Sequence, residues 1–195
     1  METGKTDPIL VTEYSSAWPV QFGQLSDIYK NFIGEYLTGI EHVGSTAVPG
    51  LPAKPVLDID LIVEDQRKLA QIIPILELLG YEYAGEAGIP DRHAFIAKSS
   101  KTPNINSGIH WPKHHLYCCI DGSTSLRNHL LLRDQLRKDP ELATAYGKLK
   151  KRLAAQTTDI DKYVEGKTEF ITDVLGKSGL NEQELQQIEH QNKKM

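Results

Sequence analysis

The stretch that decides the fold runs over residues 42–63 and reads HVGSTAVPGLPAKPVLDIDLIV. It starts with a Gly-Ser turn after an apolar residue, continues through a loop rich in glycine and proline, and ends in an apolar segment that carries two aspartates. Because successive side chains of a strand point to opposite faces, Asp58 and Asp60 are expected on one face and their apolar neighbours on the other. The pattern predicts a strand with one chemical face and one core face.

The two aspartates and the loop before them suit a metal ion and a phosphate. Carboxylates are common ligands of the Mg²⁺ ions that neutralise the charge of phosphate oxygens. Gly44 would let the backbone approach a phosphate closely, and Ser45 would add a hydroxyl and main-chain N–H donors. The alternative is that the aspartates only solvate an exposed sheet face. The preceding Gly-Ser turn, together with Lys54, favours the functional interpretation.

Composition and charge limit the class of protein. A chain of 195 residues with 39% hydrophobic and 25% charged residues is typical of a folded globular domain. No apolar run approaches the roughly 18 residues of a membrane span, and residues 1–8 show no secretion signal, so we expect a cytoplasmic protein without membrane contact. The net charge of -4 argues against nucleic acid as a partner. The adjacent Cys118 and Cys119 are expected to be reduced thiols on opposite faces of a strand.

Hydrophobic periodicity predicts a mixed first half and a helical second half. Strands are expected over residues 40–43, 57–63, 81–83, 92–98 and 114–121. Helices are expected over residues 16–37, 66–79, 124–138, 140–154 and 159–175. The polar end, residues 181–195, is expected to be a frayed helix or a tail.

The order of these features resembles the signature of the DNA polymerase β-like nucleotidyltransferase superfamily, which is here Val43-Gly44-Ser45 followed by Asp58-Ile59-Asp60. More closely, residues 42–51, Lys54-Pro55 and the same Asp-Ile-Asp are similar to the GrpB family, and a related domain is fused behind dephospho-CoA kinase in some bacteria. The resemblance spans roughly residues 8–176. Its further matches are Gly85-Glu86, Arg92, His114-His115, Arg133-Asp134, Leu136-Arg137, Tyr163, Lys167 and Phe170-Ile171.

The resemblance implies an α+β fold, namely a nucleotidyltransferase-like mixed β-sheet with helices packed on one face, followed by a C-terminal helical lobe. Residues 1–122 are expected to form the α/β core and residues 123–177 the helical lobe packed on it as one structural unit. Residues 178–195 are expected to be a polar C-terminal helix or tail.

The activity that the resemblance implies is transfer of a nucleoside monophosphate group from a nucleoside triphosphate to a hydroxyl of a small molecule or protein. Mg²⁺ is the expected cofactor, with Mn²⁺ as the alternative, and the chain is expected to be a monomer or a homodimer. Asp58 and Asp60 are expected as metal ligands and, with His115, as catalytic residues. The expected substrate- and phosphate-binding residues are Gly44, Ser45, Thr46, Lys54, Arg92, Tyr163 and Lys167.

One position departs from the superfamily pattern. A third carboxylate usually comes from a later strand, whereas strand parity places His115 on the face of the two aspartates, with Tyr117 where family members often carry a second histidine. His115 could be a neutral metal ligand, a base toward the acceptor hydroxyl, or a hydrogen-bonded sheet histidine.

Two other functions therefore stay open. The first is a non-catalytic accessory domain of the same fold that binds a nucleotide or a CoA precursor. The second is an oligomeric scaffold, for which residues 124–154 would have to present an exposed apolar face.

Overall fold

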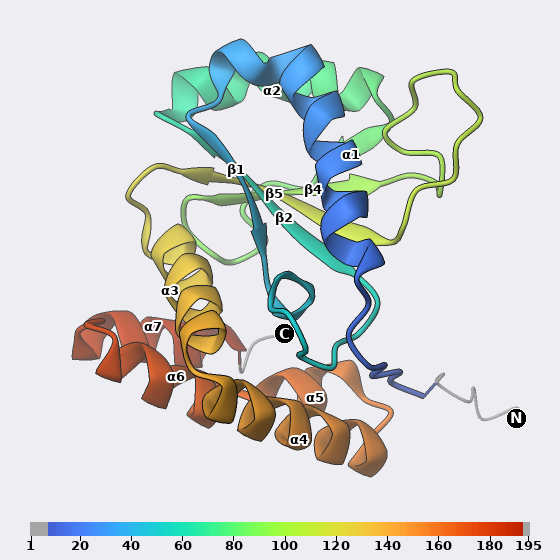
Figure 1. The fold of residues 1–195 in the computed structure, drawn as a ribbon. Coiled ribbons are helices and arrows are strands. Elements are labelled where there is room, and N and C mark those ends of the chain that lie inside the picture. Colours follow the sequence, from blue (N-terminus) through green and yellow to red (C-terminus); the bar gives the residue numbers. More distant parts are fainter. Residues whose placement is uncertain (1–7, 193–195) are drawn as a thin grey trace, which may run out of the picture.

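The computed structural model describes residues 8–192, which form a five-stranded sheet and two groups of helices (Figure 1). The sheet has the order β1-β2-β5-β4-β3, in which β2 and β5 are parallel and all other neighbours are antiparallel. This confirms the expected mixed sheet, and every expected strand is present to within one residue at each end. The strands are β1 (Gly39–Val43), β2 (Leu57–Val63), β3 (Tyr81–Tyr83), β4 (Arg92–Ala97) and β5 (His114–Ile120).

The helices follow the expected order with one exception. A single helix was expected over residues 159–175, but the chain forms two helices because the segment turns at Gly166, a weak helix former that packs against Leu153. The first helix also ends early, at Ile33, and continues as a 3-10 turn over Gly34–Tyr36. The α-helices are α1 (Ala17–Ile33), α2 (Gln66–Leu78), α3 (Thr124–Lys138), α4 (Pro140–Gln156), α5 (Ile160–Glu165), α6 (Thr168–Lys177) and α7 (Glu182–Asn192).

Side-chain caps fix where four of these helices begin. The side chains of Asp65, Ser123, Asp139 and Asp159 each accept hydrogen bonds from backbone N–H groups in the first turn of α2, α3, α4 and α5. Such a cap satisfies donors that have no partner within the helix and stabilises it by about 1 kcal/mol.

The two faces of the sheet have different covers. The apolar side chains of β2 pack against α1 and α2 in the main core, which includes Leu25, Ile59 and Ile72. Burying each such side chain contributes roughly 1.5–3 kcal/mol. The opposite face carries both aspartates, and α3 packs on part of it through Leu126, which contacts Ile62 and Cys119. Helix α3 therefore decides which part of the chemical face stays open.

The remaining helices gather at one end of the sheet and form the lobe seen in orange and red in Figure 1. Loop residues Val48 and Leu51 join the lobe to the sheet by packing against Leu136, Ala143 and Tyr146. Helix α7 is docked rather than frayed, because its Ile188 is buried against Leu175 and Leu180. Residues 193–195 of the expected tail lie outside the described residues.

Three further expectations can be compared with the structure. Within residues 8–192, no exposed large hydrophobic side chain lies in the segment 124–154, so the scaffold hypothesis lacks the apolar face that it required. No helix in the described part of the chain has both the length and the apolar character needed to cross a bilayer. Cys118 and Cys119 are both free and buried.

Candidate functional site

Asp58 is the open aspartate of the pair. The parallel register places His115 beside it, and His115 Nδ1 lies 2.9 Å from Asp58 Oδ1. A carboxylate can only accept here, so Nδ1 donates, and Nε2 is the ring nitrogen that Asp58 does not bind. Burial acts to raise the pKa of Asp58, but the hydrogen bond and charge of His115, with His129 and Lys167, outweigh it and lower the pKa. Asp58 is therefore an anion, with a side chain that is 32% exposed.

Gly44 makes this position of Asp58 possible. Its backbone has φ +68°, and a Cβ atom there would lie 2.2 Å from Asp58 Oδ2. Only glycine adopts this conformation readily and leaves that space free. Sequence reasoning assigned the space above Gly44 to a phosphate, whereas in the structure the carboxylate of Asp58 fills it. Gly44 thus holds the carboxylate against the turn that begins at Ser45.

A cavity of about 350 Å³ opens beside Asp58, between the sheet and the helical lobe. Among the described residues that line it, Asp58 is the one carboxylate, and three lysines surround it: Lys54 from the loop, Lys150 from α4 and Lys167 from the α5–α6 connection. We call this the lysine cavity. Its remaining lining residues are Ser45, Thr46, Val56, His115, Tyr117, Ile160, Tyr163 and Val164.

Lys150 is the most unusual of the three lysines. The residue is 2% exposed, and its Nζ has no hydrogen-bond partner within residues 8–192, although the ammonium lies 4.8 Å from the centre of the Tyr146 ring. Burial, reinforced by the charge of Lys167, lowers the pKa of Lys150 to about 7 against the opposing effect of Asp58. Burial likewise lowers the pKa of Lys167 to about 8.

Sequence reasoning missed Lys150, although the sequence carries a signal for it. The buried residues of α4 are Ala143, Tyr146, Gly147 and Lys150, which recur at helical spacing along one face. A lysine that continues an apolar stripe is expected to point inward with its neighbours. The nearby Lys148 falls off this stripe, whereas Lys151 lies at its edge, and both are exposed.

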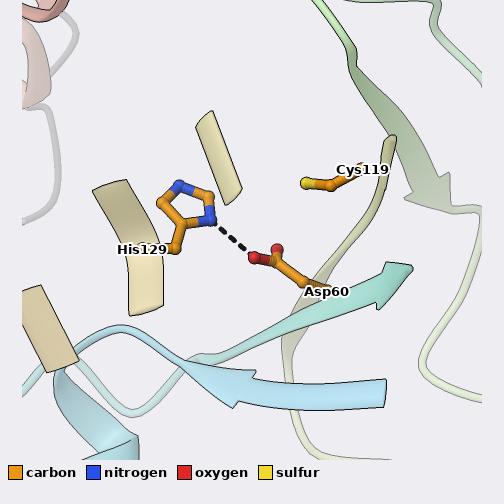
Figure 2. Close-up of side chains that lie close together, drawn as sticks. All are labelled: Asp60, Cys119 and His129. Carbon is orange, nitrogen blue, oxygen red and sulfur yellow. Dashed lines mark hydrogen bonds and ion pairs between the residues drawn. The ribbon is translucent and has the colours of Figure 1, made fainter. Parts of the chain in front are cut away.

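Asp60 lies in the opposite environment, fully buried beneath α3. Its Oδ2 is 2.7 Å from Nδ1 of His129, and Cys119 turns its sulfur toward the same point (Figure 2). Burial acts to lower the pKa of His129, but the charge and hydrogen bond of Asp60 outweigh it and raise the pKa. Asp60 does not line the lysine cavity. His129 was not expected at the site, because no motif marks it and its position depends on how α3 packs.

Most of the other expected site residues line the lysine cavity with Asp58, but one does not. Ser45, Thr46, Lys54, Tyr163 and Lys167 all meet Asp58 and His115 at the lysine cavity. Arg92 does not. Its guanidinium stacks 4.4 Å from the centre of the Tyr117 ring, and the residue borders a separate cavity next to His129.

Arg133 and Arg137 of α3 are among the residues that resemble the family. In the structure they contact the segment that contains Gly44. Arg133 Nη1 donates to Glu41 and to the backbone oxygen of His42, and Arg137 Nε donates to the backbone oxygen of Ala47. These bonds hold both ends of the segment that contains Gly44 and Ser45. The arginines therefore position the turn beside Asp58 without reaching the lysine cavity.

Comparison with protein families gives a match to the model described as GrpB protein over residues 8–177. The UPF0157 protein YqkA of Bacillus subtilis is 33% identical over 159 residues, which cover 81% of this chain and 43% of that protein. A UPF0157 protein of Pseudomonas aeruginosa is 34% identical over 173 residues, with coverage of 88% and 68%. A dephospho-CoA kinase of Mycolicibacterium paratuberculosis is 28% identical over 183 residues, and the match covers 45% of that enzyme. The chain thus spans less than half the length of the Bacillus and mycobacterial proteins.

Two solved structures share the fold. The crystal structure of GrpB from Enterococcus faecalis superposes with a TM-score of 0.73 at 35% identity, covering 87% of this chain and 96% of that one. The Cid1 poly(U) polymerase bound to MgGTP superposes with a TM-score of 0.52 at 16% identity, covering 74% and 44%. The second likeness supports the nucleotidyltransferase-like α+β fold and nothing more. The family match over most of its length shows that this chain belongs to the GrpB family.

Proposed function

We propose that the lysine cavity binds a nucleoside triphosphate with Mg²⁺, and that the protein transfers the nucleoside monophosphate group to a hydroxyl of a small molecule or protein. The observation that carries this proposal is the convergence of three lysines on one open carboxylate. Mn²⁺ is the alternative ion. The nucleotidyltransferase-like fold is compatible with this activity.

The lysine cavity is suited to a polyanion. The ammonium of Lys150 is buried without an acceptor in the described part of the chain, which is unfavourable in the free protein. Phosphate oxygens would supply the missing acceptors for Lys150 and its neighbours Lys54 and Lys167. Charge-assisted hydrogen bonds of this kind contribute roughly 1.5–3 kcal/mol each. Ser45 adds a hydroxyl group at the same wall, whereas the hydroxyl of Thr46, which also lines it, is hydrogen-bonded to His42 Nε2.

The donors present fit one Mg²⁺ ion at Asp58. Mg²⁺ prefers oxygen ligands and is commonly held by one or two carboxylates together with waters and substrate phosphates. Asp58 is ionised and half-open, whereas Asp60 is fully buried and its Oδ2 is hydrogen-bonded to His129. Asp58 would therefore hold the ion, which when bound neutralises charge on the phosphates.

His115 is placed to act as the base. Its Nδ1 is fixed by Asp58, which leaves Nε2 free to take the proton of an acceptor hydroxyl. The acceptor oxygen then forms a bond to the α-phosphorus, the bond to the leaving pyrophosphate breaks, and the proton stays on Nε2. The lysines neutralise the charge of the departing pyrophosphate. The same pairing would also orient Nε2 toward a metal ion, so base and metal ligand are both candidate roles of His115.

A thermal-shift panel of nucleoside triphosphates with Mg²⁺ tests the binding step. A ligand at about 100 times its dissociation constant should add roughly 2.7 kcal/mol of stability. We expect at least one triphosphate to stabilise the wild type, with a smaller effect on Asp58→Asn and an unchanged effect on Asp27→Asn, which alters an exposed carboxylate on α1. Release of pyrophosphate then tests transfer. A wild type that no triphosphate stabilises would contradict the proposal.

The alternative function, a non-catalytic domain that binds a nucleotide or a CoA precursor, is favoured by two observations. The mycobacterial relative is a dephospho-CoA kinase, and Asp58 has no second carboxylate beside it among the described lining residues. This function predicts ligand binding that survives Asp58→Asn and no release of pyrophosphate with any acceptor.

A further inference from the structure

Asp60, Cys119 and His129 form a compact group of potential metal ligands away from the lysine cavity. One ligand atom from each residue lies within 4.8 Å of the other two, and the three come from β2, β5 and α3. Figure 2 shows the carboxylate, the thiol and the imidazole turned toward one another. Three different elements thus present a carboxylate oxygen, a sulfur and a ring nitrogen to one point.

One atom of this group has no hydrogen-bond partner in the described part of the chain. Asp60 Oδ1 is fully buried and has no donor anywhere in residues 8–192, while Oδ2 is bonded to His129. A buried carboxylate oxygen without a partner is strongly unfavourable. A cation at this position would supply the interaction that the chain itself does not provide.

We propose that Asp60, Cys119 and His129 bind one Zn²⁺ ion, separate from the Mg²⁺ expected at Asp58. Thiolate and imidazole ligands select Zn²⁺ or Co²⁺, whereas Mg²⁺ takes oxygen ligands almost exclusively. Three protein ligands leave one tetrahedral position for water. A cavity of about 160 Å³, bordered by Arg92, Ser125 and His129, reaches the group at His129 and is large enough to hold a water molecule.

Binding of Zn²⁺ here displaces protons from two of the ligands. The ion bonds to Cys119 Sγ in place of the thiol proton and to His129 Nδ1 in place of the proton shared with Asp60. Two protons are released for each ion when His129 starts as the imidazolium. The ion would also cross-link α3 to β2 and β5, the strands on which Asp58 and His115 lie.

A competing account uses Arg92. Its Nε is also buried and finds no acceptor in the described chain, and the residue borders the same small cavity. A water molecule between Arg92 Nε and Asp60 Oδ1 would satisfy both atoms without a metal. This account predicts that the protein takes up no Zn²⁺ or Co²⁺ at this group.

Titration of the chelator-treated protein with Co²⁺ separates the two accounts. We expect one Co²⁺ per chain, with thiolate-to-cobalt charge transfer and intense tetrahedral bands in the visible spectrum. Zn²⁺ should displace the cobalt, and Mg²⁺ in large excess should not. In weakly buffered solution the wild type should release at least one proton per ion, that of the Cys119 thiol, a measurement that needs no variant to fold.

Matched variants then assign the ligands. Cys119→Ala should abolish the charge-transfer band and weaken Zn²⁺ binding by more than about 100-fold, the upper cost of losing an outer-shell partner. Cys118→Ala, which removes the neighbouring buried thiol on the other face of β5, should leave both intact. Asp58→Asn should also leave them intact, so the result is independent of the proposed transferase activity. The proposal is overturned if the wild type binds no Co²⁺, or if the spectrum survives Cys119→Ala.

Discussion

Asp58 and Asp60 share one face of β2, yet α3 leaves the first open and seals the second. Asp58 borders the lysine cavity and is bonded to a half-exposed histidine, His115. Asp60 is fully buried and bonded to His129, whose side chain is only 22% exposed. The same residue type at positions two apart therefore has two different surroundings.

This difference shows what an Asp-x-Asp pattern can and cannot indicate. Strand parity places both carboxylates on one face, but the helix that crosses the face decides which of them a ligand can reach. In this chain α3 contributes His129 to one aspartate, while α4 and the α5–α6 connection contribute lysines to the cavity of the other. The two aspartates should therefore respond differently to the same substitution.

The largest expected effect concerns the buried pair. His129→Ala leaves the carboxylate of Asp60 buried without a partner, which should lower the free energy of unfolding by about 3–5 kcal/mol. His115→Ala is the matched control, because its bond to Asp58 is partly exposed and should change stability by less than about 1 kcal/mol. Urea unfolding of both variants measures the contrast. Equal losses in the free energy of unfolding would contradict the claim that the two histidine–aspartate pairs differ in their contribution to stability.

The next effect concerns the open aspartate. Asp58→Asn should lower nucleotidyl transfer by about 10²–10³-fold, or 2.7–4 kcal/mol, the range found when one group that stabilises transition-state charge is removed. Its unfolding midpoint should remain near that of the wild type. Kinetics of pyrophosphate release, together with thermal unfolding, test both parts. Full activity in this variant would remove Asp58 from the proposed mechanism.

Gly44→Ala should affect the same carboxylate through the backbone. The new methyl group would meet Asp58 Oδ2 at a residue with φ +68°, so we expect a loss of about 1–3 kcal/mol in stability together with reduced nucleotide binding. Gly50→Ala provides the control, because Gly50 has φ +77° but a Cβ atom added there would meet nothing within 4 Å. Gly50→Ala should show the backbone strain without the loss of binding.

Much of this arrangement could be predicted from the sequence. The periodicity of residues 57–63 predicts β2 and the shared face of its aspartates, and the alternation of β5 places His115 beside them. The family resemblance supplied Tyr163 and Lys167, which the structure brings to the lysine cavity. The roles of these residues remain predictions.

The rest depends on tertiary packing that no local pattern encodes. His129 reaches Asp60 because α3 crosses the sheet at one particular position. Gly166 divides one amphipathic pattern into two helices because it packs against Leu153. Arg92 was expected at a phosphate, but it stacks on Tyr117, since both side chains leave neighbouring strands on the same side.

Lys150→Met should separate stability from binding. Replacing a buried ammonium that has no acceptor by an apolar side chain of similar length should raise stability, while triphosphate affinity falls by about 10- to 100-fold. Lys148→Met, on the exposed side of α4, should change neither. Chemical unfolding and calorimetric titration measure the two effects. A destabilised variant with unchanged affinity would assign Lys150 a structural role only.

The smallest effect is the dependence on pH. Triphosphate affinity should fall as pH rises through about 7 and 8, because Lys150 and Lys167 lose their protons there in the free protein. Folding stability should change in the opposite sense. The unfolded chain keeps these lysines protonated up to their ordinary pKa of 10.5, so it binds more protons and stability rises with pH from about 7 to 10.5. Lys150→Met should flatten both profiles.

The most direct test of the account is calorimetric titration of the stabilising triphosphate, with and without Mg²⁺, into the wild type, Asp58→Asn and Asp60→Asn. We predict Mg²⁺-dependent binding to the wild type, loss of the Mg²⁺ dependence in Asp58→Asn, and retention of that dependence in folded Asp60→Asn. Binding that depends on Asp60 and survives Asp58→Asn would contradict the assignment of the ligand site to the open aspartate.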